Sequence, residues 1–141
     1  MNPAFMGLRI LIVDDDHDSR DLLTYVLQSE GASVVAVESV QAALVVIKQQ
    51  SLDILVSDIT LPDADGYFLI QEVRRQETER GGHLPAIAVT AGARPEDRAN
   101  ALAAGFQKYL SKPVDLDELI AEITDLIPQS LEVQQSAGDG N

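Results

Sequence analysis

Charged and hydroxyl side chains stand at the ends of several short apolar runs in this sequence. Three aspartates occupy positions 14–16 after the first run, and Asp58 ends another. Thr90 directly follows the apolar run at 85–89, and Lys112 directly follows the run at 108–111. In an open sheet of parallel strands, functional sites form at the carboxyl ends of the strands, along one edge. We therefore expect these side chains to converge in one cleft.

The chemistry of such a cleft follows from its charges. Several carboxylates repel one another unless a cation neutralises them. Hard oxygen ligands completed by water suit Mg²⁺ or Mn²⁺. Beside such an ion the carboxylate of Asp58 can act as a nucleophile towards phosphorus. The ammonium group of Lys112 and the hydroxyl of Thr90 can hold the phosphoryl oxygens while negative charge is redistributed.

Each residue also has a plainer, structural interpretation. An aspartate after a strand often caps the next helix, and we expect Asp16 or Asp18 to do so here. For Asp14 or Asp15 alone, helix capping is as good an explanation as metal binding. The turn formers at 63–66, Asp-Ala-Asp-Gly, need no other role. These interpretations hold singly, but they leave the shared sheet edge unexplained.

Short β-branched runs alternate along the chain with longer segments of helical period. Five such units predict an α/β domain in which a parallel sheet carries helices on both faces. The alanine-rich fourth helix has Leu102 as its one large apolar residue, so we expect Leu102 to anchor a weakly held helix. The expected strands are 8–13, 33–37, 54–58, 85–89 and 108–111, and the expected helices include 22–27, 42–47, 66–79, 95–104 and 116–127.

The chain is predicted to form one domain at 8–127. Residues 1–7 would be an N-terminal extension without the features of a signal peptide, and residues 128–141 a polar, disordered tail. His17 and His83 are the two histidines, and neither has a matching set of metal ligands. We therefore expect both to be surface residues.

Composition excludes several function classes. The formal net charge is −13 and no stripe of Lys and Arg offsets it, which argues against direct nucleic acid binding and against attraction to an anionic membrane. No cysteine is present, so disulfides and thiolate metal sites are excluded and a reducing cytoplasm is the simplest location. The apolar runs are far shorter than the roughly 20 residues that membrane insertion needs.

Four segments together resemble the CheY-like receiver domain of bacterial response regulators, the phosphoacceptor of two-component systems. In chain order they read LIVDDD at 11–16, VSDITLPDADG at 56–66, AVTA at 88–91 and KYLSKP at 108–113. One segment alone is weakly informative, but their shared order and spacing are specific. The resemblance spans 8–127 and implies a flavodoxin-like (βα)5 fold, with a five-stranded parallel sheet in the order 2-1-3-4-5.

The resemblance implies a role for each acidic position. Asp58 would be the aspartate that is phosphorylated. Asp14 and Asp15 would hold Mg²⁺ together with Asp58, Asp15 as the more direct ligand and Asp14 largely through water. The backbone carbonyl of Thr60 would complete the protein's ligands to the ion.

The resemblance also implies roles on the later strands. Lys112 would pair with the phosphoryl group, and its peptide bond to Pro113 is expected to be cis. Thr90 would move towards the phosphoryl oxygen after Asp58 is modified. Tyr109 would then rotate inward behind Thr90.

The implied function is a switch between proteins. The donor would be a phosphohistidine on a sensor histidine kinase or histidine phosphotransfer protein. Output would reach an unidentified downstream protein through the face of the fourth helix, fifth strand and fifth helix, from a monomer or a phosphorylation-dependent dimer. The domain would be no enzyme beyond its own phosphorylation and dephosphorylation.

Thr60 and Gly92 offer no strong base or amide to position water, so we expect slow-to-moderate self-dephosphorylation. Residues 85–113 look more like receivers of hybrid sensor kinases than those fused to DNA-binding effectors.

Two other functions remain open. A phosphohydrolase of the haloacid dehalogenase type wants a second acid two residues after its aspartyl nucleophile, where this chain has Thr60. An interaction module that does not use phosphorylation usually lacks an acidic residue or the lysine, and this chain retains them. Turnover of a phosphoester would favour the first alternative, and normal signalling with Asp58→Ala would favour the second.

Overall fold

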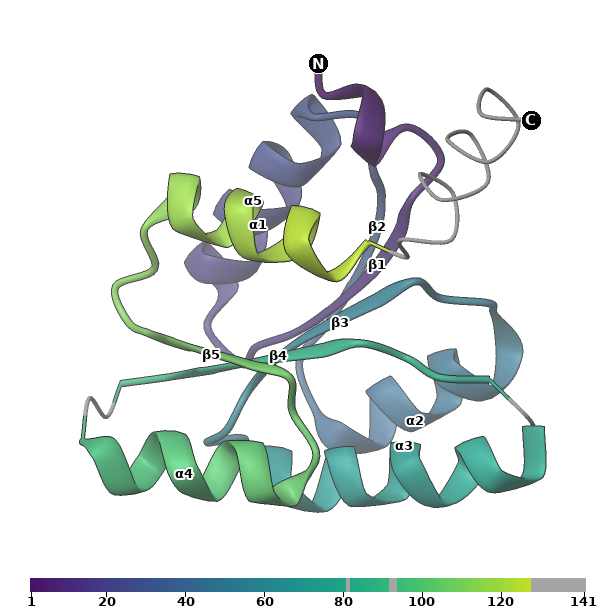
Figure 1. The fold of residues 1–141 in the computed structure, drawn as a ribbon, viewed down its shortest axis with the longest axis vertical. Coiled ribbons are helices and arrows are strands. Elements are labelled where there is room, and N and C mark those ends of the chain that lie inside the picture. Colours follow the sequence, from purple (N-terminus) through teal and green to yellow (C-terminus); the bar gives the residue numbers. More distant parts are fainter. Residues whose placement is uncertain (81, 92–93, 128–141) are drawn as a thin grey trace, which may run out of the picture.

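The structure alternates strands and helices along the chain after a short N-terminal turn (Figure 1). It is a computed structural model in which residues 1–80, 82–91 and 94–127 are described. Each strand begins and ends within one residue of its predicted bounds, and the five predicted helices are present. The elements are η1 (Pro3–Phe5), β1 (Arg9–Val13), α1 (His17–Ser29), β2 (Ser33–Val37), α2 (Val40–Gln49), β3 (Ile54–Asp58), α3 (Gly66–Arg80), β4 (Ala86–Thr90), α4 (Pro95–Ala104), β5 (Lys108–Ser111) and α5 (Leu116–Leu126).

The five strands form one parallel sheet in the order β2-β1-β3-β4-β5, which confirms the predicted topology. β1 and β3 are neighbours in the sheet although β2 separates them in sequence, and a switch of this kind is where open α/β sheets form sites. The register pairs Val13 with Ser57 and Thr90 with Ser111. The residues that end or follow these strands therefore lie along one edge.

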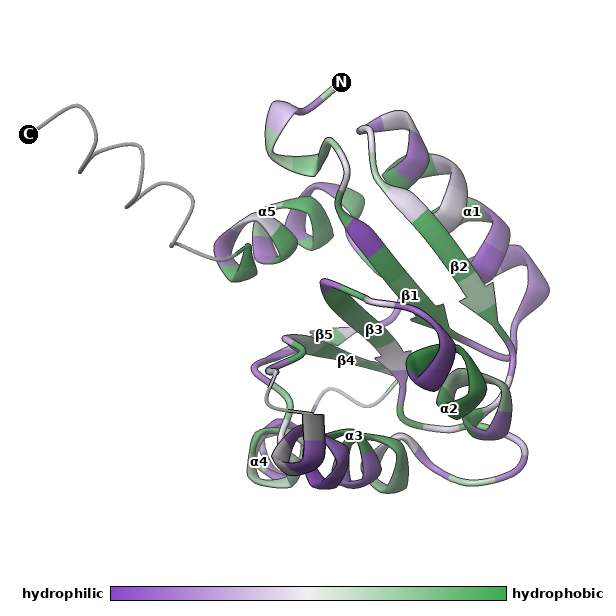
Figure 2. Cartoon of the chain, turned by 90° about the vertical axis from the view of Figure 1, so that its right-hand side faces the viewer, coloured by the Kyte–Doolittle hydropathy of each residue, from purple (hydrophilic) through white to green (hydrophobic). Residues whose placement is uncertain are grey.

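Helices cover both faces of the sheet, with α1 and α5 on one face and α2, α3 and α4 on the other (Figure 1). In β1, Ile10 and Ile12 pack towards α1 and α5, whereas Leu11 and Val13 pack towards α2 and α3. All four are fully buried, which explains the continuous apolar runs of the sequence. Figure 2 shows the apolar strands enclosed by helices that carry many hydrophilic residues. None of the helices in the described ranges is long and apolar enough to span a membrane.

Part of the segment 1–7, predicted as an extension, lies in the core. η1 places Phe5 on the α1–α5 side of the sheet, where the residue is fully buried. The backbone N–H of Asn2 donates to the carbonyl oxygen of Glu30 at 3.0 Å, which joins this segment to the end of α1. Residues 128–141, predicted as a disordered tail, lie outside the described residues.

Helix α4 buries one residue in the core, and that residue is not the one predicted. Leu102 is 41% exposed, so the prediction that it anchors the helix was wrong. Ala101 is the buried residue of α4, and adjacent helix residues point about 100° apart, so only one of the two can face the core. Phe106 packs into the same core just after the helix ends. The large apolar anchor therefore lies outside α4.

Candidate phosphoacceptor and metal site

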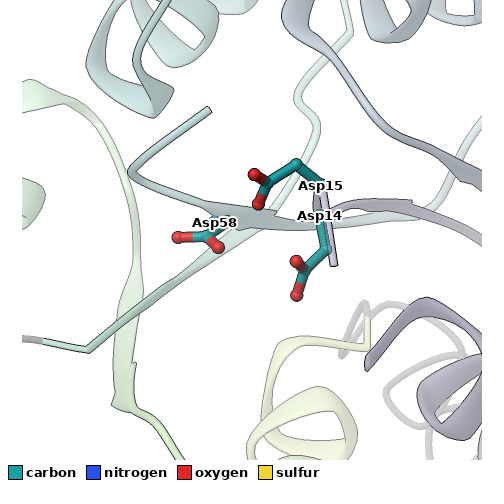
Figure 3. Close-up of side chains that lie close together, drawn as sticks. All are labelled: Asp14, Asp15 and Asp58. Carbon is teal, nitrogen blue, oxygen red and sulfur yellow. The ribbon is translucent and has the colours of Figure 1, made fainter. Parts of the chain in front are cut away.

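Three carboxylates meet at the carboxyl edge of the sheet, between β1 and β3. Asp14 follows β1 directly, and Asp58 is the last residue of β3. Both are buried, with 3% and 6% exposure, whereas Asp15 is exposed. Oxygen atoms of the three carboxylates lie within 4.8 Å of one another (Figure 3). The fold thus brings these three predicted ligands together.

Lys112 joins this cluster directly after β5. Its Nζ atom lies 2.8 Å from Oδ2 of Asp58 and 3.1 Å from Oδ2 of Asp14. Burial by itself lowers the pKa of Lys112, but hydrogen bonds to Asp58 and Asp14 and their charges outweigh burial and raise that pKa. The amine is therefore a cation at neutral pH. The peptide bond from Lys112 to Pro113 is cis, as the resemblance implied.

Each buried carboxylate has partners at both of its oxygens. Oδ1 of Asp58 accepts from the backbone N–H of Thr60 at 3.1 Å. Oδ1 of Asp14 accepts from the backbone N–H of Asp16 at 2.9 Å. Both Oδ2 atoms face Lys112. The two carboxylates are therefore fixed in orientation by backbone on one side and by a shared cation on the other.

Helix α1 supports the acidic segment. The carboxylate of Asp16 accepts from the backbone N–H of Ser19 at 2.9 Å, which confirms the predicted cap. Arg20, 17% exposed at its side chain, donates from Nη1 to the backbone carbonyl of Asp14 at 2.8 Å. Sequence reasoning missed Arg20. The available signal was its position one helical turn after Asp16, which returns its side chain to the start of the helix.

The β3–α3 loop, residues 59–65, is closed at its base. The backbone N–H of Gly66 donates to the carbonyl of Ile59 at 2.7 Å. A β-carbon at Gly66 would lie 2.6 Å from the backbone oxygen of Asp58 and 2.9 Å from Cα of Ile59, closer than real β-carbons approach backbone atoms. Glycine is therefore required for α3 to begin this close to the Asp58 backbone.

Two aspartates of the β3–α3 loop cap helices, so they do more than form a turn, contrary to the prediction. Oδ1 of Asp65 accepts from the backbone N–H of Phe68 at 2.8 Å, at the start of α3. The carboxylate of Asp63 accepts from the backbone N–H groups of Val40 and Gln41 at 3.0 and 2.9 Å. The second contact joins residues more than 20 positions apart, and local turn propensity carries no information about it.

Thr90 and Tyr109 share one face of the sheet. Thr90 ends β4 opposite Ser111, and Tyr109 precedes Ser111 by two residues on β5. Residues two apart in a strand lie on the same face, here the one covered by α2, α3 and α4. Both are half-buried. Burial raises the pKa of Tyr109, and the charge of Asp97 and the neighbouring Tyr67 contribute in the same direction. The switch roles of Thr90 and Tyr109 stay predictions.

The two histidines and Gly92 are the remaining residues that the sequence singled out. His17 and His83 are exposed, as predicted, and pair with Asp21 at 3.1 Å and Glu77 at 3.4 Å. Gly92, which offers no side-chain group to position water in the predicted phosphoryl lifetime, lies outside the described residues. Neither histidine belongs to the group formed by Asp14, Asp15 and Asp58.

The acidic cluster fits a divalent metal ion. Across residues 1–80, 82–91 and 94–127, Asp14, Asp15 and Asp58 are the one group of three or more His, Asp or Glu side chains with oxygens or nitrogens close enough to share an ion. With three carboxylates and the ammonium group of Lys112, the formal charge is −3 + 1 = −2. One divalent cation balances that charge, and oxygen-only ligands suit a hard cation.

Comparisons with known proteins identify relatives of this chain. The response regulator receiver domain family matches residues 10–124. The "Uncharacterized 14.6 kDa protein in sodA1 3'region" of Leptolyngbya boryana is 50% identical over 111 residues, which cover 79% of this chain and 83% of that protein. The sensor histidine kinase RcsC of Salmonella typhi is 38% identical over 112 residues, which cover 79% of this chain and 11% of the kinase.

A solved structure supports the same relationship. The receiver domain of the response regulator Ssk1, in a co-crystal with the histidine phosphotransfer protein Ypd1 of Saccharomyces cerevisiae, matches with a TM-score of 0.84 and 26% identity. The match covers 89% of this chain and 92% of that chain. This chain spans about half or less of its longer curated relatives, such as 49% of the regulatory protein VanRc of Enterococcus gallinarum. The chain belongs to the response regulator receiver domain family, the receivers of two-component and phosphorelay systems.

Proposed function

We propose that this receiver domain accepts a phosphoryl group from a phosphohistidine onto Asp58. The donor would be a sensor histidine kinase or a histidine phosphotransfer protein. The observation that carries the proposal is the ammonium group of Lys112, 2.8 Å from Asp58 and 3.1 Å from Asp14. A fixed cation beside a carboxylate nucleophile stabilises the oxygens of an arriving phosphoryl group.

The transfer exchanges one bond to phosphorus for another. A carboxylate oxygen of Asp58 bonds to phosphorus while the bond from phosphorus to the donor imidazole nitrogen breaks, and the imidazole keeps that electron pair. Lys112 holds a phosphoryl oxygen through the transfer. Bound Mg²⁺, or Mn²⁺, would neutralise the remaining negative charge. The residues that would hold the ion are Asp14, Asp15, Asp58 and the carbonyl of Thr60.

Output would use the face formed by α4, β5 and α5. Movement of Thr90 towards a phosphoryl group would leave space for Tyr109 to turn inward, because the two share a sheet face. Helix α4 buries only Ala101 among its residues, and its N-cap residue Arg94, within the described part of the chain, makes no capping side-chain hydrogen bond. Few contacts therefore oppose a shift of α4. A downstream protein, or a second copy of the domain, would read the altered face.

Residues around Asp58 favour a signalling switch over a phosphohydrolase. Thr60 stands two residues after Asp58, where a haloacid dehalogenase-type hydrolase wants an acid. Thr60 offers no strong base to position water, so loss of the phosphoryl group would be slow to moderate. The formal charge of −13 disfavours direct contact with nucleic acid. We place the domain in the cytoplasm, where histidine kinases draw on ATP.

Intact-mass measurement after incubation with phosphoramidate or acetyl phosphate, with and without Mg²⁺, tests the proposal. We expect one added phosphoryl group that requires Mg²⁺ and is absent from Asp58→Asn. Asp53→Asn is a matched control, because Asp53 precedes the same strand at its opposite end and its carboxylate accepts from the backbone N–H of Arg9. A folded protein that binds Mg²⁺ but takes no phosphoryl group would favour the phosphorylation-independent interaction module.

A further inference from the structure

The β3–α3 loop makes a contact outside the phosphoacceptor cluster. Asp63 accepts hydrogen bonds from the backbone N–H groups of Val40 and Gln41, the first two residues of α2. From this geometry we propose that Asp63 is a positioning residue: it fastens the β3–α3 loop to α2 and so holds Thr60 beside Asp58. The consequence for phosphorylation rests on the proposed function, whereas the positioning itself does not.

Asp63 supplies hydrogen-bond acceptors to N–H groups at the start of α2. The first N–H groups of a helix have no partner inside the helix. The side-chain oxygen of the N-cap Ser39 accepts from the backbone N–H of Ala42, at 3.1 Å, and the carboxylate of Asp63 accepts from those of Val40 and Gln41. A carboxylate also interacts favourably with the positive end of the helix dipole. The hydrogen bonds from Gln41 and Val40 lower the pKa of Asp63, so its carboxylate is charged at neutral pH.

The β3–α3 loop can transmit this contact to the site because it is short and closed. Thr60 and Asp65 form an isolated antiparallel bridge, so Asp63 lies in a turn of a few residues between them. The backbone N–H of Thr60 donates to Oδ1 of Asp58 at 3.1 Å. A shift of Asp63 therefore displaces the residue that orients the Asp58 carboxylate and whose carbonyl would face the ion.

The other end of the contact leads to Asp14. α2 begins at Val40, three residues after Val37, the last residue of β2. The carbonyl of Val37 accepts from the backbone N–H of Asp14 at 3.1 Å. Asp63 thus connects the segment that carries Asp58 with a segment bonded to Asp14. Fixing both segments holds the separation between the two carboxylates.

The test compares three variants of the full chain. Asp63→Ala removes both hydrogen bonds, and Asp63→Asn keeps one acceptor oxygen but places an NH2 group where the second acceptor was. Ser39→Ala is the matched control, because it removes the other side-chain cap of α2 without touching the β3–α3 loop. The measurements are amide hydrogen exchange at Thr60 by NMR, the Mg²⁺ dissociation constant by calorimetry, and the rate of phosphorylation by phosphoramidate.

Asp63→Ala is expected to speed exchange of the Thr60 amide and to weaken Mg²⁺ binding about tenfold, as loss of outer-shell support does at metal sites. Phosphorylation at a subsaturating, fixed Mg²⁺ concentration should slow by a similar factor. Asp63→Asn should give a smaller change in the same direction. Ser39→Ala should leave the Thr60 amide and the Mg²⁺ dissociation constant unchanged, although it also destabilises α2.

Two outcomes separate this inference from the proposed function. Thr60 exchange in the Asp63 variants equal to that in Ser39→Ala would overturn the positioning role, whatever the phosphorylation rates. Faster Thr60 exchange in a protein whose wild type takes no phosphoryl group would leave the positioning role standing and refute the function. Should Asp63→Ala fail to fold, Asp63→Asn decides by the same comparison.

Discussion

Lys112 and Asp58 are 54 residues apart in sequence, and Nζ of the lysine lies 2.8 Å from Oδ2 of the aspartate. The sheet explains this contact. The backbone N–H of Lys112 donates to the carbonyl of Thr90 at 2.8 Å, and that of Ile59 donates to the carbonyl of Val89 at 3.0 Å. β3 and β5 are therefore aligned on the two sides of β4, and the lysine side chain reaches across the end of β4 to the carboxylate.

Removing the charge of Lys112 tests this contact. Lys112→Met keeps the aliphatic chain, and we expect phosphorylation of Asp58 by phosphoramidate to slow by about 10²-fold, the usual effect of losing one preorganised donor where charge is redistributed. Time courses of intact mass measure the rate. Lys108→Met is the control, because Lys108 begins β5, the strand that Lys112 follows, and pairs with Asp125 and Glu122, at 2.6 and 3.6 Å. Equal rates for the two variants would remove Lys112 from the proposed chemistry.

Gly66 gives a prediction about packing next to the phosphoacceptor. In Gly66→Ala the new β-carbon would meet backbone atoms of Asp58 and Ile59, and backbone cannot swing aside as a side chain can. We expect a loss of about 1–3 kcal/mol in the free energy of unfolding, as for other overpacked sites. Phosphorylation should also slow. Gly82→Ala has open space around its β-carbon and should change neither urea unfolding nor the phosphorylation rate.

The sequence predicted the strands and the acidic cluster because both depend on local patterns. Continuous apolar runs mark buried strands, and parallel strands end on a common edge, so the sequence alone placed Asp14, Asp58 and Lys112 together. Strand bounds agreed within one residue for the same reason.

Contacts set by tertiary packing could not be predicted in this way. Asp63 caps a helix that begins 23 residues earlier, and only the folded loop brings the two together. In α4, helical spacing does not decide whether Ala101 or Leu102 faces the core, and size alone favoured the wrong residue. Phe5 precedes the first strand and has no periodic neighbours, so its burial left no pattern in the sequence.

The burial of Phe5 predicts that the N-terminal segment stabilises the domain. Phe5→Ala removes a fully buried aromatic side chain from the core between the sheet, α1 and α5. We expect a loss of about 3–5 kcal/mol in the free energy of unfolding, measured with urea. Met6→Ala, at a residue that is 60% exposed, should change it by less than about 0.5 kcal/mol. Equal midpoints for the two variants would mean that Phe5 adds no stability to the domain, and would favour the prediction that residues 1–7 are an extension.

Acid unfolding gives a separate prediction for Asp63. Its hydrogen bonds with Gln41 and Val40 lower its pKa below 3.8 in the folded protein. A carboxyl group whose pKa is lowered by folding stabilises the protein above its unfolded pKa, and this contribution is lost as pH falls through the folded pKa. The unfolding midpoint in urea should therefore differ between wild type and Asp63→Asn near neutral pH, and the two midpoints should converge below pH 3.8.

Other carboxylates do not disturb this comparison. Asp16 and Glu72, whose pKa values are also lowered, are present in both proteins and cancel in the difference between the two midpoints. If the difference between the two midpoints stayed constant down to about pH 2, the negative charge of Asp63 would add nothing to the stability that its contact with α2 provides.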